Sequence, residues 1–157
     1  MVSKDVLKQK EWRKNMLTKQ YLGQIKRLDR MIQNKLSEIY QLKTMACSIT
    51  IEPKEDKIQT SSDKDRMGST VVKIVDLENE VDSLVDELVD KRKRIIEQID
   101  NMDNDDYYHI LTERYVLKKT FSEISEEKDW SERHIYRVHD KAIVEFERIY
   151  GEEYLKL

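Results

Sequence analysis

The chain has 157 residues, of which 39% are charged and 38% are hydrophobic, and its net charge is −3. With only one proline and three glycines, this composition favours an all-α protein with long helices. Cys47 is the only cysteine, which excludes an intramolecular disulfide and a multi-cysteine zinc site and favours a reducing compartment. The N-terminus has no apolar signal segment and no run is long enough to span a membrane, so we expect a cytoplasmic protein with no membrane partner.

The charge is unevenly distributed along the chain. Residues 1–50 carry eleven basic and four acidic side chains, whereas residues 51–106 carry nine and seventeen. Residues 107–157 are nearly balanced, with nine basic and eleven acidic side chains. The N-terminal third is therefore the basic part of the molecule, although the net charge of the whole chain does not indicate nucleic-acid binding.

An apolar seam indicates a long N-terminal helix, assigned to residues 1–47. From about residue 17 to residue 46, apolar side chains recur at spacings of three and four, the a/d pattern of a coiled coil. Lys35 occupies the one interrupted position of this seam. The seam residues are Ile25, Leu28, Ile32, Ile39, Leu42 and Ala46.

The only proline, a glycine and a mixture of Ser, Asp and Lys then break the period over residues 48–68, which we predict to be a linker. An apolar period resumes over residues 69–103, and its stripe is wide enough to contact more than one neighbour. We expect the two helices to form a long antiparallel, coiled-coil-like hairpin. Because two helices alone bury little surface, either the C-terminal region docks on them or the hairpin forms a homo-oligomer.

Residues 104–157 are predicted to form a separate module of three helices. They are placed near 106–118, 120–128 and 131–150. The third helix begins with a hydrophobic staple between Trp130 and Ile135, and Gly151 lies where a helix C-terminal cap is expected.

The second and third of these helices form a helix-turn-helix pattern. Thr120 and Glu123 match the S/T-x-x-E capping box, and Ser131 provides a second N-cap. Between them, Asp129 tolerates the left-handed conformation that such turns often need. A short helix, a tight turn and a strongly capped second helix are typical of this motif, but also of a plain helical hairpin.

The third helix has two chemically different faces when it is projected at 100° per residue. One face is apolar and is predicted to be core: Ile135, Val138, Ala142, Phe146 and Ile149. The opposite face is basic: Arg133, Arg137, Lys141 and Arg148. Asp140 intrudes on the basic face.

Two interpretations of the basic face remain open. In the first, the helix enters the major groove of double-stranded DNA, with Arg133 and Arg137 reaching base edges or phosphates and the other two cations reaching phosphates. In the second, the face is only the solvated side of an amphipathic helix. Under the first interpretation, the DNA-binding residues are Ser131, Glu132, Arg133, His134, Tyr136, Arg137, Lys141 and Arg148.

The stretch TFSEISEEKDWSERHIYRVHDKAI resembles region 4 of the sigma-70 family. The matching or similar positions are Thr120, Phe121, Glu123, Ile124, Trp130, Ser131, Ile135, Val138 and Ala142. Ser125, Lys128 and Asp129 depart from the family pattern, from which we expect a looser turn.

A second resemblance covers nearly all of residues 20–150, including YLGQIKRLDRMIQNKL and QTSSDKDRMGSTVVKIVDLE. Here the chain is similar to phage and prophage proteins of Gram-positive bacteria related to ArpU-like and RinA-like transcriptional regulators. This resemblance implies transcription control through DNA. The alternative is a helical interaction module that binds RNA polymerase or a sigma factor without touching DNA.

Other chemistries find little support in the sequence. His134 and His139 are five residues apart, which misses the i, i+4 spacing of a helical metal pair, and no glycine-rich phosphate loop exists. The basic run at 91–94 is flanked by Asp90 and Glu97, which can pair with it. We therefore expect no enzymatic activity, no metal site and no cofactor.

Overall fold

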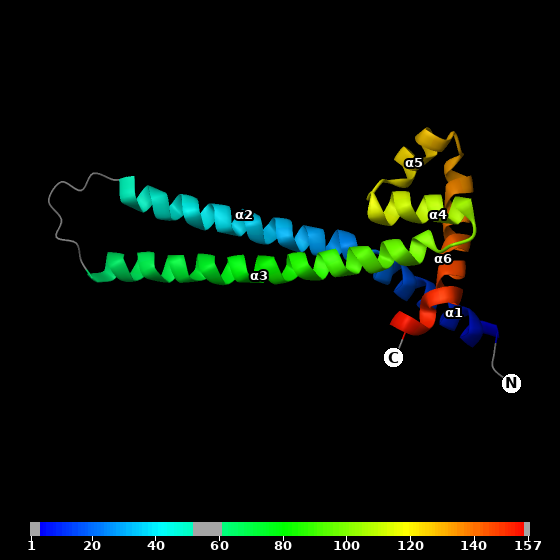
Figure 1. Cartoon of the computed structure of the whole chain (residues 1–157), viewed down its shortest axis with the longest axis horizontal. Helices are drawn as coiled ribbons and strands as arrows, with labels where there is room; N and C mark the ends of the chain where they lie inside the picture. The colour runs from blue at the N-terminus through cyan, green and yellow to red at the C-terminus, as the bar shows by residue number, and fades with distance from the viewer. Residues whose placement is uncertain (1–3, 52–60, 156–157) are drawn as a thin grey trace. The chain divides into compact units, whose positions relative to one another are not determined.

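The computed structural model describes residues 4–51 and 61–155. Within these residues the protein is all-α, with no strand, which confirms the predicted fold class (Figure 1). The elements are α1 (Lys4–Leu22), α2 (Gln24–Ile51), α3 (Ser61–Asp100), α4 (Asp105–Leu111), the π-helical segment η1 (Thr112–Val116), α5 (Phe121–Lys128) and α6 (Glu132–Tyr154). They form two compact units, one comprising Met1–Arg27 with Val89–Leu157 and the other comprising Leu28–Leu88.

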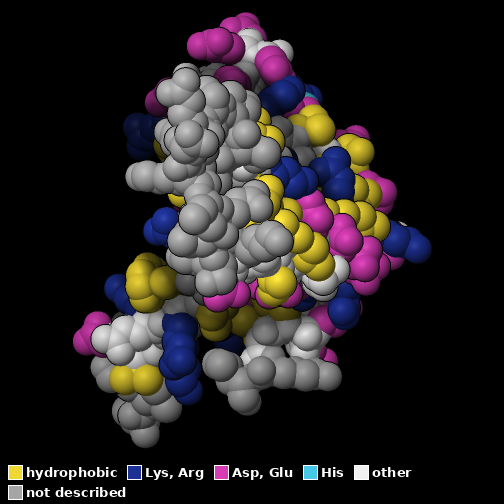
Figure 2. Space-filling view, turned by 90° about the vertical axis from the view of Figure 1, so that its left-hand side faces the viewer, with side chains coloured by type: hydrophobic (Ala, Val, Ile, Leu, Met, Phe, Trp, Pro, Cys, Tyr) yellow, Lys and Arg dark blue, Asp and Glu magenta, His cyan; other side chains and the backbone are white. Residues whose placement is uncertain are grey.

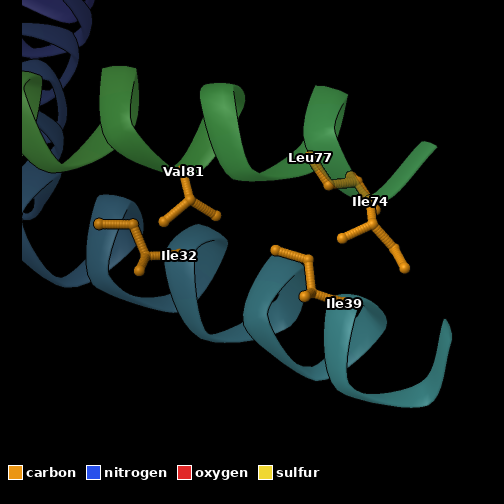
Figure 3. Packing of buried hydrophobic residues seen from close by; sticks show 5 residues of the cluster. All are labelled: Ile32, Ile39, Ile74, Leu77 and Val81. Atoms are coloured by element: carbon orange, nitrogen blue, oxygen red, sulfur yellow. The ribbon is translucent and has the colours of Figure 1, made fainter. Parts of the chain in front are cut away.

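The Leu28–Leu88 unit is the predicted hairpin of α2 and α3. Figure 3 shows apolar side chains of the two helices pointing toward one another across a common seam. The buried members are Ile32, Ile39, Ile74, Leu77 and Val81, and each has an exposed fraction of 9% or less. Leu42, Leu84 and Leu88 pack partly buried against this cluster. The a/d spacing read from the sequence therefore places the seam correctly.

Ion pairs between α2 and α3 border the seam. Lys35, which interrupts the a/d pattern, pairs with Glu80. Lys43 Nζ lies 2.7 Å from a carboxylate oxygen of Glu78. Long cationic side chains at such positions cover apolar surface with their methylene groups while the charged end reaches a partner in water, so Lys35 is compatible with the seam.

Both hairpin helices extend into the range predicted as a linker. Helix α2 continues to Ile51 and α3 already begins at Ser61, so much of 48–68 is helical, and residues 52–60 lie outside the described part of the chain. Near the start of α3, the hydroxyls of Ser69 and Thr70 donate to the carbonyl of Arg66 at 3.0 and 2.9 Å. Gly68 within α3 costs the helix only about 1 kcal/mol, and a helix of this length with a packed face tolerates that cost.

The second unit is built around α6. Helices α4 and α1 pack against it, and α5 packs against its first turns. Docking of the N-terminal helix on the C-terminal module is one of the two arrangements expected from the sequence. The largest fully buried apolar side chains are those of Leu22, Ile25, Ile95, Ile99, Ile110, Leu111, Ile124, Ile135, Ile143 and Phe146.

A polar network connects α1, the end of α3 and the end of α6. The Tyr21 hydroxyl donates to Gln98 Oε1 at 2.8 Å, and Gln98 Nε2 donates to Glu153 at 2.8 Å. Arg94, from the basic run at 91–94, also donates to Glu153 at 2.9 Å. Tyr154 stacks on Tyr21 with ring centroids 4.3 Å apart. Because Gln98 is buried and both ends of its amide are bonded, the network fixes three segments without an unsatisfied group.

Two predictions for α6 were wrong. Gly151 does not end the helix, because α6 continues to Tyr154 and Leu155 is the C-terminal cap, donating to the Gly151 carbonyl at 2.8 Å. Gly151 is instead buried, and a Cβ there would lie 3.2 Å from a methyl group of Leu155. Ile149 is 40% exposed, while Ile143 is fully buried. The core face of the helix therefore turns toward Ile143, since α1 as well as α4 packs on α6.

Among the described residues, no helix is both long enough and apolar enough to cross a membrane.

Candidate functional site

The start of α5 is fixed by the predicted capping box. The backbone N–H of Glu123 donates to the Thr120 hydroxyl at 3.2 Å, and the Glu123 carboxylate accepts from the Thr120 backbone N–H at 2.6 Å. The bond from the Thr120 backbone N–H, with a second from the Thr120 hydroxyl at 2.7 Å, holds the pKa of the Glu123 carboxyl below its usual value. Two of the unsatisfied donors at the start of the helix are thus paired by local sequence alone.

The turn between α5 and α6 is closed by residues that depart from the sigma region 4 pattern. Asp129 adopts the left-handed conformation with φ 53° and ψ 37°, as its residue type predicts. The Ser125 hydroxyl bonds to the Trp130 carbonyl, and the Trp130 N–H donates to the Ser125 carbonyl at 3.1 Å. The Ser125 side chain therefore bridges the turn, and the looser turn implied by the resemblance stays a prediction.

Helix α6 begins at the predicted N-cap. The Ser131 side chain accepts from the His134 N–H at 3.3 Å. Trp130 is half-buried, and its ring packs edge-on against His134 with centroids 4.7 Å apart. Lys128 Nζ lies 5.5 Å from the centroid of the Trp130 ring. Ile135, the other predicted member of the staple, is fully buried.

The packed side of α6 agrees with the sequence at four of five positions. Ile135, Val138, Ala142 and Phe146 are buried. The sequence analysis missed His139, which is only 4% exposed. A histidine carries no apolar signal, so its burial depends on partners elsewhere in the chain.

His139 is held by two aromatic residues. Its Nε2 lies 2.9 Å from the Tyr115 hydroxyl, and its ring packs edge-on against Phe121 at 5.0 Å. Its Nδ1 lies 3.6 Å from Asp140. The pKa of His139 is lowered to about 4, mainly by burial and also by the charge of Lys19, whereas Asp140 opposes the shift. A neutral ring with its proton on Nδ1 then accepts from the Tyr115 hydroxyl, whose pKa is raised by burial.

The exposed side of α6 contains most of the predicted DNA-binding residues. Ser131, Glu132, Arg133, Arg137 and Lys141 are exposed along its first three turns. Arg133, Arg137 and Lys141 recur every four residues and therefore lie next to one another along the helix; we call these three residues the basic strip. No ion pair of these three residues with an acidic side chain is found in the described part of the chain.

His134 and Tyr136 border the basic strip. His134 is half-buried, and its Nδ1 lies 2.8 Å from an Nη atom of Arg137, which positions that guanidinium. Tyr136 is 51% exposed, and its ring packs against Phe121 at 4.8 Å. The guanidinium of Arg114 lies over the same Phe121 ring, 4.6 Å from its centroid. The start of α5 therefore supports the first half of α6.

Arg148 is separated from the basic strip. It donates two hydrogen bonds to the Glu145 carboxylate at 2.7 and 2.9 Å, which raise the pKa of the guanidinium. It lies seven residues after Lys141, the last residue of the basic strip, or about 10 Å along the helix axis. With Lys14 of α1 and Val144, it lines a cavity of about 770 Å³. Arg148 thus shares the face predicted for it, but its charge is already paired.

Asp140, the acid that intrudes on the basic face, has a partner in α1. Lys19 Nζ donates to Asp140 Oδ1 at 3.1 Å. Five residues before Lys19 on α1, Lys14 Nζ lies 3.7 Å from a carboxylate oxygen of Glu147 in α6. The Thr18 hydroxyl of α1 also bonds to the Tyr154 hydroxyl of α6, at 2.9 Å. Helix α1 therefore places cations against the acids on this side of α6, which the sequence could not reveal for residues this far apart.

The described residues contain no group of three or more His, Cys, Asp or Glu side chains that could hold a metal ion.

Comparison with known proteins places the chain in a family. Residues 50–147 match the family model described as "Protein of unknown function (DUF1492)", and the match covers more than half of the chain. It extends from the end of α2 into α6 and includes all of α3, α4 and α5. No curated protein matches the chain, and no solved structure matches it. The chain belongs to the family of proteins of unknown function DUF1492.

Proposed function

We propose that this protein binds double-stranded DNA as a transcriptional regulator, with α6 in the major groove. The observation that carries this proposal is the basic strip. Arg133, Arg137 and Lys141 lie exposed on the first three turns of a helix whose opposite side is packed and whose start is fixed by a capped turn. In helix-turn-helix proteins, residues in the first turns of the second helix contact base edges.

The local charge around the basic strip supports a polyanionic partner. The segment 120–142 contains six acids and four bases, but three of these acids are engaged elsewhere. Glu123 caps α5, Glu127 pairs with Lys119 at 2.6 Å, and Asp140 pairs with Lys19. The strip thus presents three cations that lack acidic partners among the described contacts. Glu132, at the exposed start of α6, would accept from a cytosine amino group.

The resemblance to sigma region 4 and to ArpU-like and RinA-like phage and prophage regulators agrees with this proposal. It suggests that Ser131 and Tyr136 contact the DNA backbone, since hydroxyls commonly donate to phosphates. The resemblance implies transcription control and does not itself assign a contact with RNA polymerase. The competing function is a helical interaction module that binds RNA polymerase or a sigma factor without DNA.

The experiment begins with selection of bound duplexes from a random pool, using the full chain. On the selected site, Arg137→Ala should weaken binding by about 1 to 3 kcal/mol, which is roughly five- to 150-fold. Arg66→Ala is the matched control, because Arg66 is an exposed arginine of α3 far along the chain from α6. Circular dichroism of both variants should match that of the parent.

The two functions give different outcomes. If no duplex is enriched, or if Arg137→Ala and Arg66→Ala bind the selected DNA as tightly as the parent, α6 does not read DNA. Retention of the parent protein on RNA polymerase in the absence of DNA would then favour the interaction module.

A further inference from the structure

The two sides of the α2 and α3 hairpin differ chemically. On one side, Lys35 of α2 pairs with Glu80 of α3, and Lys73 of α3 lies 3.3 Å from Glu38 of α2. Projected at 100° per residue, these four residues fall on the same side of the buried seam. We call this the charged side, and two ion pairs between the helices close it.

The opposite side of the hairpin exposes a run of apolar side chains beside one ion pair between the helices, Lys43 with Glu78 at 2.7 Å. Hydrophobic side chains from both helices project there, with exposed fractions from 39% to 72%. They are Leu36, Tyr40, Met67, Val71, Val75 and Val85. We call this surface the apolar side. Figure 2 shows hydrophobic side chains at the molecular surface among acidic and basic ones. Scattered exposed apolar residues are ordinary, but a stripe that follows two helices indicates a contact surface.

The spacing on α3 is that of a second helix-packing seam. Val71, Val75, Glu78, Asp82 and Val85 follow one another at alternating steps of four and three residues. This is the spacing of a coiled-coil seam, and it lies about a quarter-turn from the seam that faces α2. Two of its positions are acidic. Glu78 already pairs with Lys43 of the same hairpin at 2.7 Å, whereas Asp82 is exposed, so the occupant of this seam has to supply a cation opposite Asp82.

The charges of the two helices identify that occupant. Within the hairpin unit, residues 28–51 contain three basic and two acidic residues, whereas residues 61–88 contain three basic and eight acidic residues. Contact between two α3 helices would place Glu78 and Asp82 against acids of the other copy. Contact of α3 with the α2 of another copy would bring together helices of opposite charge. A second copy of this chain therefore offers a complementary surface.

We propose that two copies of this chain dimerise through their apolar sides, with α3 of each copy packed against α2 of the other. The product is an antiparallel four-helix bundle in which every neighbouring pair of helices is antiparallel and oppositely charged. The interface is isologous, so each copy contributes the same residues twice. In the described part of each hairpin, the buried cluster between the helices contains five residues, and the dimer supplies the additional burial that a two-helix unit lacks.

The first test compares two valines of α3 in the full chain. Val75 lies on the apolar side and is 48% exposed, whereas Val72 is 60% exposed and points away from both seams. Because a charge inside the interface would lose its hydration, Val75→Glu should raise the dimer dissociation constant at least about tenfold. Val72→Glu should leave that constant within about threefold of the parent value. Sedimentation equilibrium over a concentration series measures both, with circular dichroism as the check on folding.

The second test asks which helices meet. Asp82→Lys should weaken the dimer if α3 packs against the basic α2 of the other copy, whereas it should strengthen a dimer in which two α3 helices meet. A parent protein that stays monomeric at all concentrations would overturn the proposal. Equal effects of Val75→Glu and Val72→Glu, or a tighter dimer with Asp82→Lys, would overturn it as well.

Discussion

The ammonium of Lys19 in α1 donates a hydrogen bond of 3.1 Å to Asp140 in α6, between residues 121 positions apart in the sequence. Asp140 lies beside the basic strip, on the face proposed to meet DNA. An unpaired carboxylate there would repel phosphates, and Lys19 offsets its charge. The N-terminal helix is therefore part of the electrostatics of the candidate site as well as of the packing around α6.

A double-mutant cycle on this pair tests that role. Lys19→Gln should weaken DNA binding a few-fold at low salt, because it exposes the Asp140 charge, whereas Asp140→Asn should strengthen it. In the Asp140→Asn background, Lys19→Gln should have little further effect. The measurement is fluorescence anisotropy with the selected duplex.

Lys14→Gln is the matched control for this cycle, because it removes the same charge from α1 next to Glu147. Both partners of the Lys19 pair are largely exposed, so neither single variant should change the free energy of unfolding by more than about 1 kcal/mol. An undiminished effect of Lys19→Gln in the Asp140→Asn background would mean that Lys19 contacts DNA itself.

The buried His139 predicts a pH-dependent stability. Its pKa is about 4 in the folded protein and about 6.5 when unfolded, so the unfolded state binds the extra proton between these values. The contribution of the neutral, buried His139 to the free energy of unfolding should therefore be fully present above about pH 6.5. It should decrease as the pH falls toward 4. Between pH 6.5 and pH 4.5 the loss attributable to this residue is on the order of 2 kcal/mol.

Urea unfolding of the parent and of His139→Phe across this pH range isolates the contribution, because the carboxylates are common to both proteins. The variant loses the Tyr115 hydrogen bond at every pH, so its stability is lower overall but its pH profile should be flatter. Parallel profiles for the two proteins would show that His139 does not titrate on unfolding.

Gly151→Ala tests whether the buried Gly151 leaves room for a methyl group inside α6. Gly151 lies inside α6, where alanine has the higher helix propensity by about 1 kcal/mol. The added Cβ would approach Leu155 and Glu147 at 3.2 and 3.3 Å, and both of these are side-chain atoms at the partly exposed end of the helix. We expect thermal unfolding to show a stability equal to the parent's or higher by up to about 1 kcal/mol. A loss of about 1 kcal/mol or more would mean that the neighbouring side chains do not yield.

The sequence predicts the features of this fold that depend on neighbouring residues. The caps at Thr120 and Ser131 and the left-handed Asp129 each follow from a few adjacent side chains, and the structure confirms them. The hairpin seam follows from a strict a/d period, which also predicts burial of Ile32 and Ile39.

The errors concern contacts between distant segments. Ile149 continues the apolar period of α6, yet it is exposed because the packing partners lie on the side of Ile143. Burial of His139 requires Tyr115 and Phe121 from other elements, and pairing of Asp140 requires α1. Such contacts depend on how the helices dock, which periodicity within one helix does not determine.

The salt dependence of duplex binding tests the central claim most directly. Each phosphate contact adds about 0.9 to the slope of log affinity against log salt, so three contacts from the basic strip predict a slope of about −2.7. Removing one strip cation, as in Arg137→Ala, should make that slope shallower by about 0.9 if Arg137 contacts a phosphate, or lower the affinity at an unchanged slope if it contacts a base. Absence of duplex binding at low salt, or a slope near zero in the parent, would contradict the assignment of α6 as a DNA-binding helix.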